Sequence, residues 1–262
     1  MAKKEKGYYT IQSVAHALDI LEQYQGDVDE LGVTELGNRL KLHKNNVFRL
    51  LATLEVRGYI EQNKATEKYR LGLKSLELGQ AFLKHMGLLR QARPILKGLV
   101  DSCNETAYVS IIRDRMAVYL DAVESNQTVR VVSRVGHRIP VYCTAAGKVQ
   151  IAFESEEELD RILPKELTKY TDNTLTDRKK LIEHLKEVTR KGYAIDNEEY
   201  DPGVKCVGVP VRDYTKRVVG GLSISGPAYR LTPARIEKEL VPLMLKAGHE
   251  LSSKLGFEVG GS

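Results

Sequence analysis

Apolar residues recur at helical spacing in three short stretches near the start of the chain, over residues 10–25, 33–42 and 43–57. Steps of three and four residues are typical of amphipathic helices, and we expect Thr34 to be the N-cap of the second helix. The residues that share a face are Ile11, Val14, Ala15, Leu18 and Leu21, then Leu36 and Leu40, then Val47, Leu50, Leu51 and Leu54. Two short helices with so tight a connection, supported by a first helix, predict a helix-turn-helix.

The face of the third helix opposite its apolar stripe carries amides and an arginine but no carboxylate. This outward side comprises Asn45, Asn46, Phe48, Arg49, Ala52 and Thr53. Asparagine and arginine bond adenine and guanine edges in a major groove, and Lys44 lies at the helix start, where a phosphate is favoured. A surface helix packed on one face is the simpler interpretation of any single pattern of this kind.

A polar turn separates two strand-like runs after Gly58, in "YIEQNKATEKYRLG", and predicts a hairpin that carries Lys64, Lys68 and Arg70. A helix-turn-helix followed by a basic hairpin is a winged helix, whose wing contacts the DNA backbone. Charge supports this interpretation. Residues 39–74 hold nine Lys and Arg against three Glu, a balance of +6, whereas the whole chain has +5. Such a segment attracts a polyanion, although an ordinary solvent-exposed surface can also be rich in lysine and arginine.

Residues 73–87 form a further helical pattern, which is either a linker that pairs two chains or a core helix of a second domain. From residue 88 strands and helices alternate. We expect strands in "ETAYVSIIRD" and "MAVYLDAVES", with β character continuing over residues 129–144, and a last helix that begins at Thr232-Pro233. Helices around a mostly antiparallel sheet predict an α+β fold.

Composition narrows the class of protein. The start "MAKKEKGYYT" lacks the apolar stretch of a signal peptide, and no run is long enough for a membrane helix. The three cysteines are far apart, which favours reduced thiols in the cytoplasm over a disulfide framework or a zinc site. No phosphate-binding loop, nucleophile elbow or metalloprotease motif is present. We therefore expect a cytoplasmic protein without a membrane partner, metal or cofactor.

The chain resembles the IclR family of bacterial transcriptional regulators over nearly its whole length. In the first domain the resemblance lies in "SVAHALDILE", "VTELGNRLKL", "VFRLLATLEVRGY" and "YRLGLKSLELG". In the second domain it lies in "TAAGK", "GGLSISGP" and the spaced series Gly192, Asp196, Glu199, Cys206, Gly208, Val211 and Asp213. The segment "LKLHKNNV" departs from the family's usual residues at the start of the third helix, so the resemblance does not predict the operator sequence.

This resemblance implies a winged helix-turn-helix DNA-binding domain over residues 8–72, a linker helix over 73–87 and a GAF-like effector-binding domain over 88–258. Its implied partners are a double-stranded DNA operator, a small organic or aromatic acid and a second copy of the chain, as a homodimer or tetramer. The DNA-binding residues predicted from the outward helix face and the hairpin are Lys44, Asn45, Asn46, Phe48, Arg49, Thr53, Lys64, Lys68 and Arg70. The implied effector-binding residues are Ala145, Ala146, Asp196, Cys206, Ser223 and Ser225, with the ligand carboxylate at the Ala145-Ala146 backbone and the serine hydroxyls.

Two other classes of protein remain open from the residues. A GAF-like enzyme would use Cys206 as its nucleophile, but no base is evident, because His184 and His249 lie among charged neighbours where a surface position is expected. An architectural DNA-binding protein would not need so large a second domain. We therefore predict a non-enzymatic regulator with no catalytic residue. The sequence leaves its effector, its operator and the choice between repressor and activator undetermined.

Overall fold

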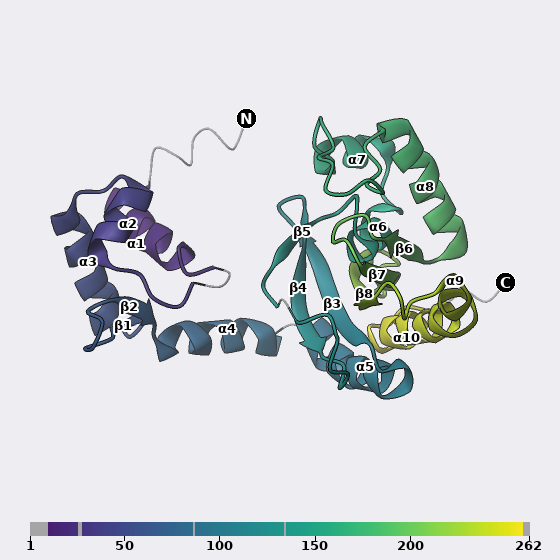
Figure 1. The fold of residues 1–262 in the computed structure, drawn as a ribbon, viewed down its shortest axis with the longest axis horizontal. Helices are drawn as coiled ribbons and strands as arrows, with labels where there is room; N and C mark the ends of the chain where they lie inside the picture. The colour runs from purple at the N-terminus through teal and green to yellow at the C-terminus, as the bar shows by residue number, and fades with distance from the viewer. Residues whose placement is uncertain (1–9, 26–27, 86, 134, 259–262) are drawn as a thin grey trace. The chain divides into compact units, whose positions relative to one another are not determined.

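The computed structural model describes residues 10–25, 28–85, 87–133 and 135–258. The chain divides into two compact units, residues 1–85 and 86–262, which are described separately (Figure 1). No helix of the described residues is long and apolar enough to cross a membrane.

The first unit consists of helices and one small hairpin. Its elements are α1 (Gln12–Glu22), α2 (Val33–Leu40), α3 (Lys44–Val56), β1 (Ile60–Gln62), β2 (Tyr69–Leu71) and α4 (Leu73–His85). The predicted stripe of α3 is confirmed, because Val47, Leu50, Leu51 and Leu54 are all buried. They pack with Ile20 of α1 and Leu36 of α2 into one core. The helix-turn-helix and the hairpin therefore form a single body.

The predicted N-cap of α2 is wrong. Gly32 caps this helix, because its carbonyl accepts the first helical hydrogen bond, from the backbone N–H of Leu36 at 3.0 Å. Thr34 therefore lies inside the first turn. The tight turn into α3 uses the left-handed backbone of Lys41, with φ of 55°. A side chain at Gly37 would also place its Cβ 3.0 Å from the carbonyl oxygen of Leu42.

The hairpin is tied to the body of this unit at both ends. The backbones of Leu31 and Tyr69 exchange two hydrogen bonds of 2.9 Å. Gly72 approaches so closely that a Cβ there would lie 2.4 Å from the carbonyl oxygen of Gly58. The next helix, α4, belongs to the first unit, and its described leucines Leu73, Leu76 and Leu78 are exposed. Gly87, the last residue of the expected linker, belongs to α5 of the second unit, and the pairing of two chains through this helix stays a prediction.

The second unit is built on a six-stranded antiparallel sheet in the order β5-β4-β3-β8-β7-β6. Its strands are β3 (Thr106–Arg113), β4 (Met116–Val123), β5 (Arg138–Pro140), β6 (Ala194–Asn197), β7 (Val204–Arg212) and β8 (Val218–Pro227). Its helical segments are α5 (Gly87–Cys103), α6 (Ala145–Ile151), α7 (Glu156–Ile162), α8 (Arg178–Lys191), α9 (Pro233–Arg235), the π-helical η2 (Ile236–Leu240) and α10 (Val241–Lys254). The α+β prediction is confirmed, as is the last helical segment's start at Thr232-Pro233.

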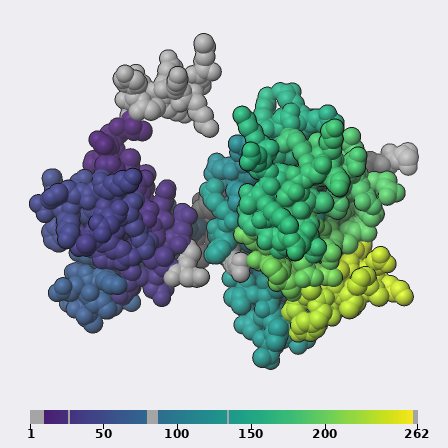
Figure 2. Space-filling model, turned by 45° about the horizontal axis from the view of Figure 1, so that its top comes forward, coloured from purple at the N-terminus to yellow at the C-terminus, as the bar shows by residue number. Residues whose placement is uncertain are grey.

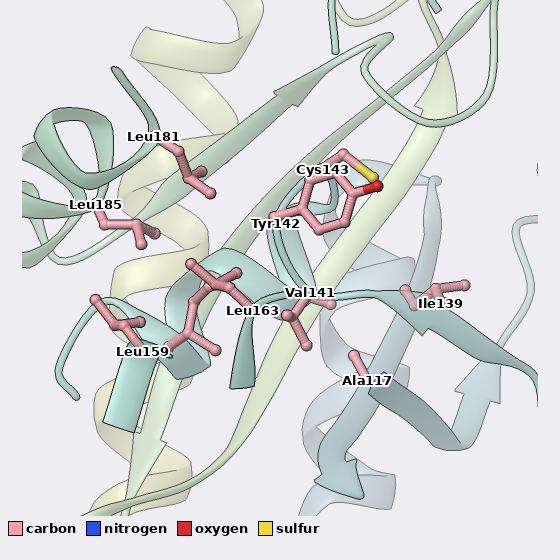
Figure 3. Close-up of a cluster of buried hydrophobic side chains, with 11 residues drawn as sticks. Ala117, Ile139, Val141, Tyr142, Cys143, Leu159, Leu163, Leu181 and Leu185 are labelled. Carbon is pink, nitrogen blue, oxygen red and sulfur yellow. The ribbon is translucent and has the colours of Figure 1, made fainter. Parts of the chain in front are cut away.

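Glycines bring α6 against one face of the sheet. A Cβ at Gly208 would lie 2.8 Å from the carbonyl oxygen of Ala145, and one at Gly221 would lie 3.2 Å from that of Ala146. Helices α5 and α10 pack on the sheet as well, with Gly248 of α10 closely packed on Val209. Leucines of α7 and α8 pack with the segment that leads into α6 (Figure 3). In the space-filling view the green residues of this region cover much of the visible face of the second unit (Figure 2).

The β character expected over residues 129–144 is wrong for most of that segment. Among its described residues only β5 is a strand. The backbone carbonyls of Val129, Val131 and Val132 accept hydrogen bonds from side chains instead. Thr106 Oγ1 donates to the Val131 carbonyl at 2.7 Å, and Arg230 donates to that of Val129 at 2.9 Å. The valine-rich pattern was therefore misleading. The backbone carbonyls of these valines accept hydrogen bonds from side chains and not from a neighbouring strand.

Candidate nucleic-acid interface and effector cavity

The outward side of α3 is open to solvent as its sequence pattern predicts. His43 caps the helix, its Nδ1 accepting from the backbone N–H of Asn45 at 3.3 Å. The predicted contact residues on this helix, Lys44, Asn45, Asn46, Phe48, Arg49 and Thr53, are all exposed. Thr53 Oγ1 donates to the Arg49 carbonyl at 2.9 Å, so this hydroxyl is already partly engaged. Among the described residues the Arg49 side chain makes no ion pair, which leaves its guanidinium available to a groove.

The three predicted basic residues of the hairpin differ in their partners. Arg70 pairs with Glu61 directly across the two strands at 2.7 Å, and both side chains are about half exposed. Within the described part of the chain Lys64 and Lys68 form no ion pair. An exposed pair contributes little to stability, but it reduces the charge offered to a phosphate. Lys64 and Lys68 are therefore better placed than Arg70 for phosphate contacts.

Glu30 fixes the tip of the hairpin, and the sequence pattern did not single it out. Its carboxylate accepts from Asn63 Nδ2 at 2.6 Å and from Thr66 Oγ1 at 2.8 Å. These two hydrogen bonds lower the pKa of Glu30. The carboxylate lies more than thirty residues before its partners, so only the folded chain brings the three together. Glu30 thus orients the turn that carries Lys64.

A small cavity lies in the second unit at the edge of α6. Its volume is about 40 Å³, whereas ligand sites in proteins usually hold about 300–1,000 Å³. Three predicted effector residues, Asp196, Cys206 and Ser225, line it. It is also lined by residues that were not predicted, chiefly Tyr108, Tyr119, Thr144, Tyr200 and Asp201. A cavity of this volume has room for a few waters, so a larger ligand would require a wall to move.

The sheet places the three predicted lining residues in one row. Cys206 is the register partner of Asp196 on one side and of Ser225 on the other. Ser225 Oγ donates to Cys206 Sγ at 3.0 Å. Ser223 lies two residues earlier on the same face, and its buried hydroxyl has no hydrogen-bond partner among the described residues. The row is therefore polar on a face that is otherwise tightly packed.

Ser223 does not line the cavity, and neither do the other two predicted residues, Ala145 and Ala146. Both are buried in the first turn of α6, with their carbonyl oxygens against the sheet glycines. The residue before them, Thr144, does line the cavity and caps α6, its Oγ1 accepting from the backbone N–H of Gly147 at 3.3 Å. The structure thus brings Thr144 to the cavity wall in place of the two alanines.

The electrostatics of the cavity favour uncharged groups. Burial raises the pKa of Asp196 to about 7, although the nearby Lys148 opposes this rise. Burial, reinforced by Asp196, raises the pKa of the Cys206 thiol well above its usual range. A nucleophilic cysteine needs a lowered pKa, so Cys206 is a protonated wall residue at neutral pH. Among the described residues no group of three or more His, Cys, Asp or Glu is arranged to hold a metal ion.

The raised pKa of Asp196 predicts a pH-dependent effect of the Asp196→Asn substitution on stability. A carboxyl whose pKa is raised in the folded state destabilises that state once it ionises, so wild-type stability falls as pH rises from about 4 to about 7. In wild type the Asp196 carboxylate accepts a hydrogen bond from the Glu199 backbone N–H at 2.8 Å. Asparagine cannot ionise, but its side-chain oxygen can accept the same hydrogen bond.

We therefore expect Asp196→Asn to be more stable than wild type by about 2–4 kcal/mol at pH 8 and equally stable near pH 4. Urea unfolding of both proteins at each pH measures the difference. A difference that is the same at both values would mean that Asp196 titrates normally in the fold.

A buried charge cluster behind the cavity was missed by the sequence pattern. Lys148 has no exposed side-chain surface and pairs with Glu199 at 2.6 Å. His184, expected at the surface, is half-buried, and its Nε2 lies 3.3 Å from Lys148 Nζ. Burial and the lysine charge lower the pKa of His184, so the ring is neutral at pH 7. The available signal was a lysine that directly follows three small residues in "TAAGK".

Both units match families of known proteins. Residues 13–64 match the IclR helix-turn-helix domain, and residues 80–253 match the bacterial transcriptional regulator IclR C-terminal domain. The chain is 35% identical to the HTH-type transcriptional regulator KdgR of Escherichia coli K12 over 249 residues, which cover 95% of this chain and 94% of KdgR.

Solved structures share the same architecture. The crystal structure of the Thermotoga maritima IclR matches with a TM-score of 0.79 and 32% identity, covering 95% of this chain and all of that one. An IclR homologue from Microbacterium hydrocarbonoxydans, complexed with 4-hydroxybenzoate, matches in fold with a TM-score of 0.84 and 22% identity over 93% of this chain and 99% of that one. The matched families consist of transcriptional regulators, which confirms the prediction of a regulator and gives no support to the enzyme that would use Cys206.

Proposed function

Because this chain belongs to the IclR family of bacterial transcriptional regulators, we propose that its operator affinity is modulated by a small organic acid bound in the cavity of the second unit. The chain is a DNA-binding regulator by that membership. The observation that supports a ligand is the buried polar row beside α6, in which the Ser223 hydroxyl has no partner among the described residues. Buried polar groups are normally bonded, and Ser223 lies two residues from the cavity-lining Ser225 on the same strand face, so its hydroxyl suits a ligand that enlarges the cavity.

For DNA, the proposal assigns base reading to α3 and phosphate contacts to the hairpin. Asn45, Asn46 and Arg49 would reach base edges, because they are exposed on the side opposite the apolar stripe. Lys44 at the helix start, with Lys64 and Lys68 on the hairpin, would contact phosphates on either side. Phe48, Thr53 and Arg70 border this surface and complete the proposed interface.

We further propose that the protein binds its operator as a homodimer, with dimers able to pair into tetramers. A single recognition helix covers only a few base pairs, and a two-fold dimer doubles the contact. Exposed apolar side chains of Val14 and Leu18 on α1, of its N-cap Ile11 and of α4 offer surface that a second copy would cover. Light scattering of the free protein is expected to give the mass of a dimer or tetramer. A strict monomer that still bound its operator tightly would contradict this assembly.

The effector would meet Asp196, Cys206, Ser223 and Ser225, with the start of α6 at Ala145 and Ala146 beside them. A neutral Asp196 would donate to a carboxylate or accept from a ligand hydroxyl, so an acid would not face a fixed like charge. A ligand changes DNA affinity only if it favours one arrangement of the protein over another. A thermal-shift screen of small carboxylates and aromatic acids, followed by DNA binding with each hit, tests the proposal. A screen with no hit that alters DNA affinity would reject it.

Ser223→Ala is expected to raise the stability of the ligand-free protein and to lower its affinity for the ligand. Removal of a buried hydroxyl without a partner stabilises the ligand-free protein by about 1 kcal/mol. The same change is expected to lower the affinity for the screened acid by about 2- to 12-fold, which corresponds to the free energy of one hydrogen bond. Urea unfolding and calorimetry measure the two effects.

Ser110→Ala is the matched control. Ser110 is buried in β3, and its hydroxyl is bonded by Gln150 Nε2 at 3.0 Å. This variant should lose stability and keep its ligand affinity. Equal ligand affinity in wild type and Ser223→Ala would show that the acid binds elsewhere.

A further inference from the structure

All three N–H groups of the buried Lys148 ammonium have a partner. Lys148 Nζ lies 2.6 Å from Glu199 Oε1, 2.6 Å from the Ile195 carbonyl oxygen and 3.3 Å from His184 Nε2. Since His184 is neutral, its Nε2 can accept the third hydrogen bond. The ammonium is thus solvated entirely by protein groups from α8, from β6 and from the turn after β6.

Stability alone does not explain this pair. Removing two charges from water costs several kcal/mol per ion, and apolar residues of similar volume often replace such pairs without loss. The pair is also incompletely satisfied, because Glu199 Oε2 is buried without a hydrogen-bond partner among the described residues. A cluster selected only to stabilise the core would not leave a carboxylate oxygen in that state.

The pair is positioned to hold one wall of the cavity. Lys148 bonds both ends of the segment 195–199, and the Asp196 carboxylate between them accepts from the Glu199 backbone N–H at 2.8 Å. Thr174 Oγ1 donates to the Glu199 carbonyl at 2.6 Å. The next two residues along the chain, Tyr200 and Asp201, line the cavity.

Lys148 belongs to α6, a helix that is held firmly in place. Every residue of α6 is buried. A Cβ at Gly147, directly before Lys148, would lie 2.3 Å from the Cα of Val141. Neither α6 nor the sheet beneath it can shift easily, so Lys148 transmits the position of α6 to the segment 195–201.

We propose that Lys148 and Glu199 are positioning residues of the cavity, which hold β6 and the turn after it so that Asp196, Tyr200 and Asp201 stay in the cavity wall beside Cys206. The pair itself does not touch the ligand. This inference rests on the proposed function only in naming the cavity as the effector site. Its test uses no effector, so it can fail while that function stands.

The test is site-resolved labelling of the cysteines of the full chain with N-ethylmaleimide, followed by peptide mass spectrometry. The variant is Lys148→Met/Glu199→Met, because changing both partners leaves no orphaned buried charge and keeps the volume similar. Cys206 is expected to react at least about tenfold faster than in wild type, because the wall above it opens. Cys103, buried at the end of α5, should keep its wild-type rate and serves as an internal control.

Gln150→Met is the matched control variant. Gln150 is also a buried polar residue of α6, but it bonds Ser110 and the Ala146 carbonyl, which lie outside the segment 195–201. Its Cys206 rate should equal that of wild type. An unchanged Cys206 rate in the double variant would overturn the proposal. Parallel acceleration of Cys103 and Cys206 would also overturn it, because the pair would then support the fold as a whole.

Discussion

Replacing Arg49 by alanine is expected to lower affinity for the preferred operator by about 1–3 kcal/mol and to relax sequence preference at one base pair. The guanidinium lies in the middle of the outward side of α3 and makes no ion pair among the described residues. A bidentate arginine contact discriminates a base, so its loss affects the specific site and spares unrelated DNA. Fluorescence anisotropy with operator and scrambled duplexes measures both affinities.

Two sets of control variants make this expectation specific. Lys64→Ala and Lys68→Ala should lower the affinity for both duplexes equally. Each should also reduce the slope of log affinity against log salt concentration by about one, as the loss of a phosphate contact does. Arg39→Ala removes an arginine of the same basic segment that already pairs with Glu35 at 2.7 Å, and it should not alter base preference. If Arg49→Ala bound the operator as wild type does, α3 would not be the helix that reads bases.

Gly147→Ala is expected to destabilise the second unit by about 3 kcal/mol, which is large for the addition of one methyl group. The new Cβ would lie 2.3–2.7 Å from three backbone atoms of Val141, which cannot move as a flexible side chain would. Helix α6 must then shift, and it carries both the cavity residue Thr144 and the buried Lys148. Amide hydrogen exchange of the second unit in the full chain reports the loss.

Gly98→Ala is the control for the glycine substitution. Gly98 is exposed on α5, and a Cβ there would meet no atom within 4 Å. Because alanine favours a helix over glycine by about 1 kcal/mol, this variant should be as stable as wild type or more so. Equal protection of amides in Gly147→Ala and wild type would mean that α6 is not seated as closely as described.

Local spacing predicted the buried face of α3 but not that of α1, where Ile20 is buried and the expected Val14 and Leu18 are exposed. The α3 stripe of Val47, Leu50, Leu51 and Leu54 follows directly from helical periodicity, and so does the outward position of Arg49. The Thr232 cap was readable because cap and first-turn proline are neighbours. The cap of α2 was not, because Gly32 and Thr34 both suit such a position and only the backbone chooses between them.

The cavity was predictable only in part, because its wall joins residues that are far apart in the chain. Asp196, Cys206 and Ser225 were assigned by resemblance, and strand register places them in one row. Tyr108 and Tyr119 stack with ring centroids 4.5 Å apart across β3 and β4, a contact that no local pattern encodes. The pair of Lys148 and Glu199 spans 51 residues, and a lysine with no exposed surface contradicts the usual preference of its type.

Selection of bound duplexes from a random DNA library, carried out with the full wild-type chain and with Arg49→Ala, tests the central claim most directly. We predict that wild type enriches one sequence with approximate two-fold symmetry and that Arg49→Ala loses a base preference at corresponding positions of both halves. No enriched sequence for wild type, or the same sequence for both proteins, would contradict the assignment of α3 as the element by which this protein reads its operator.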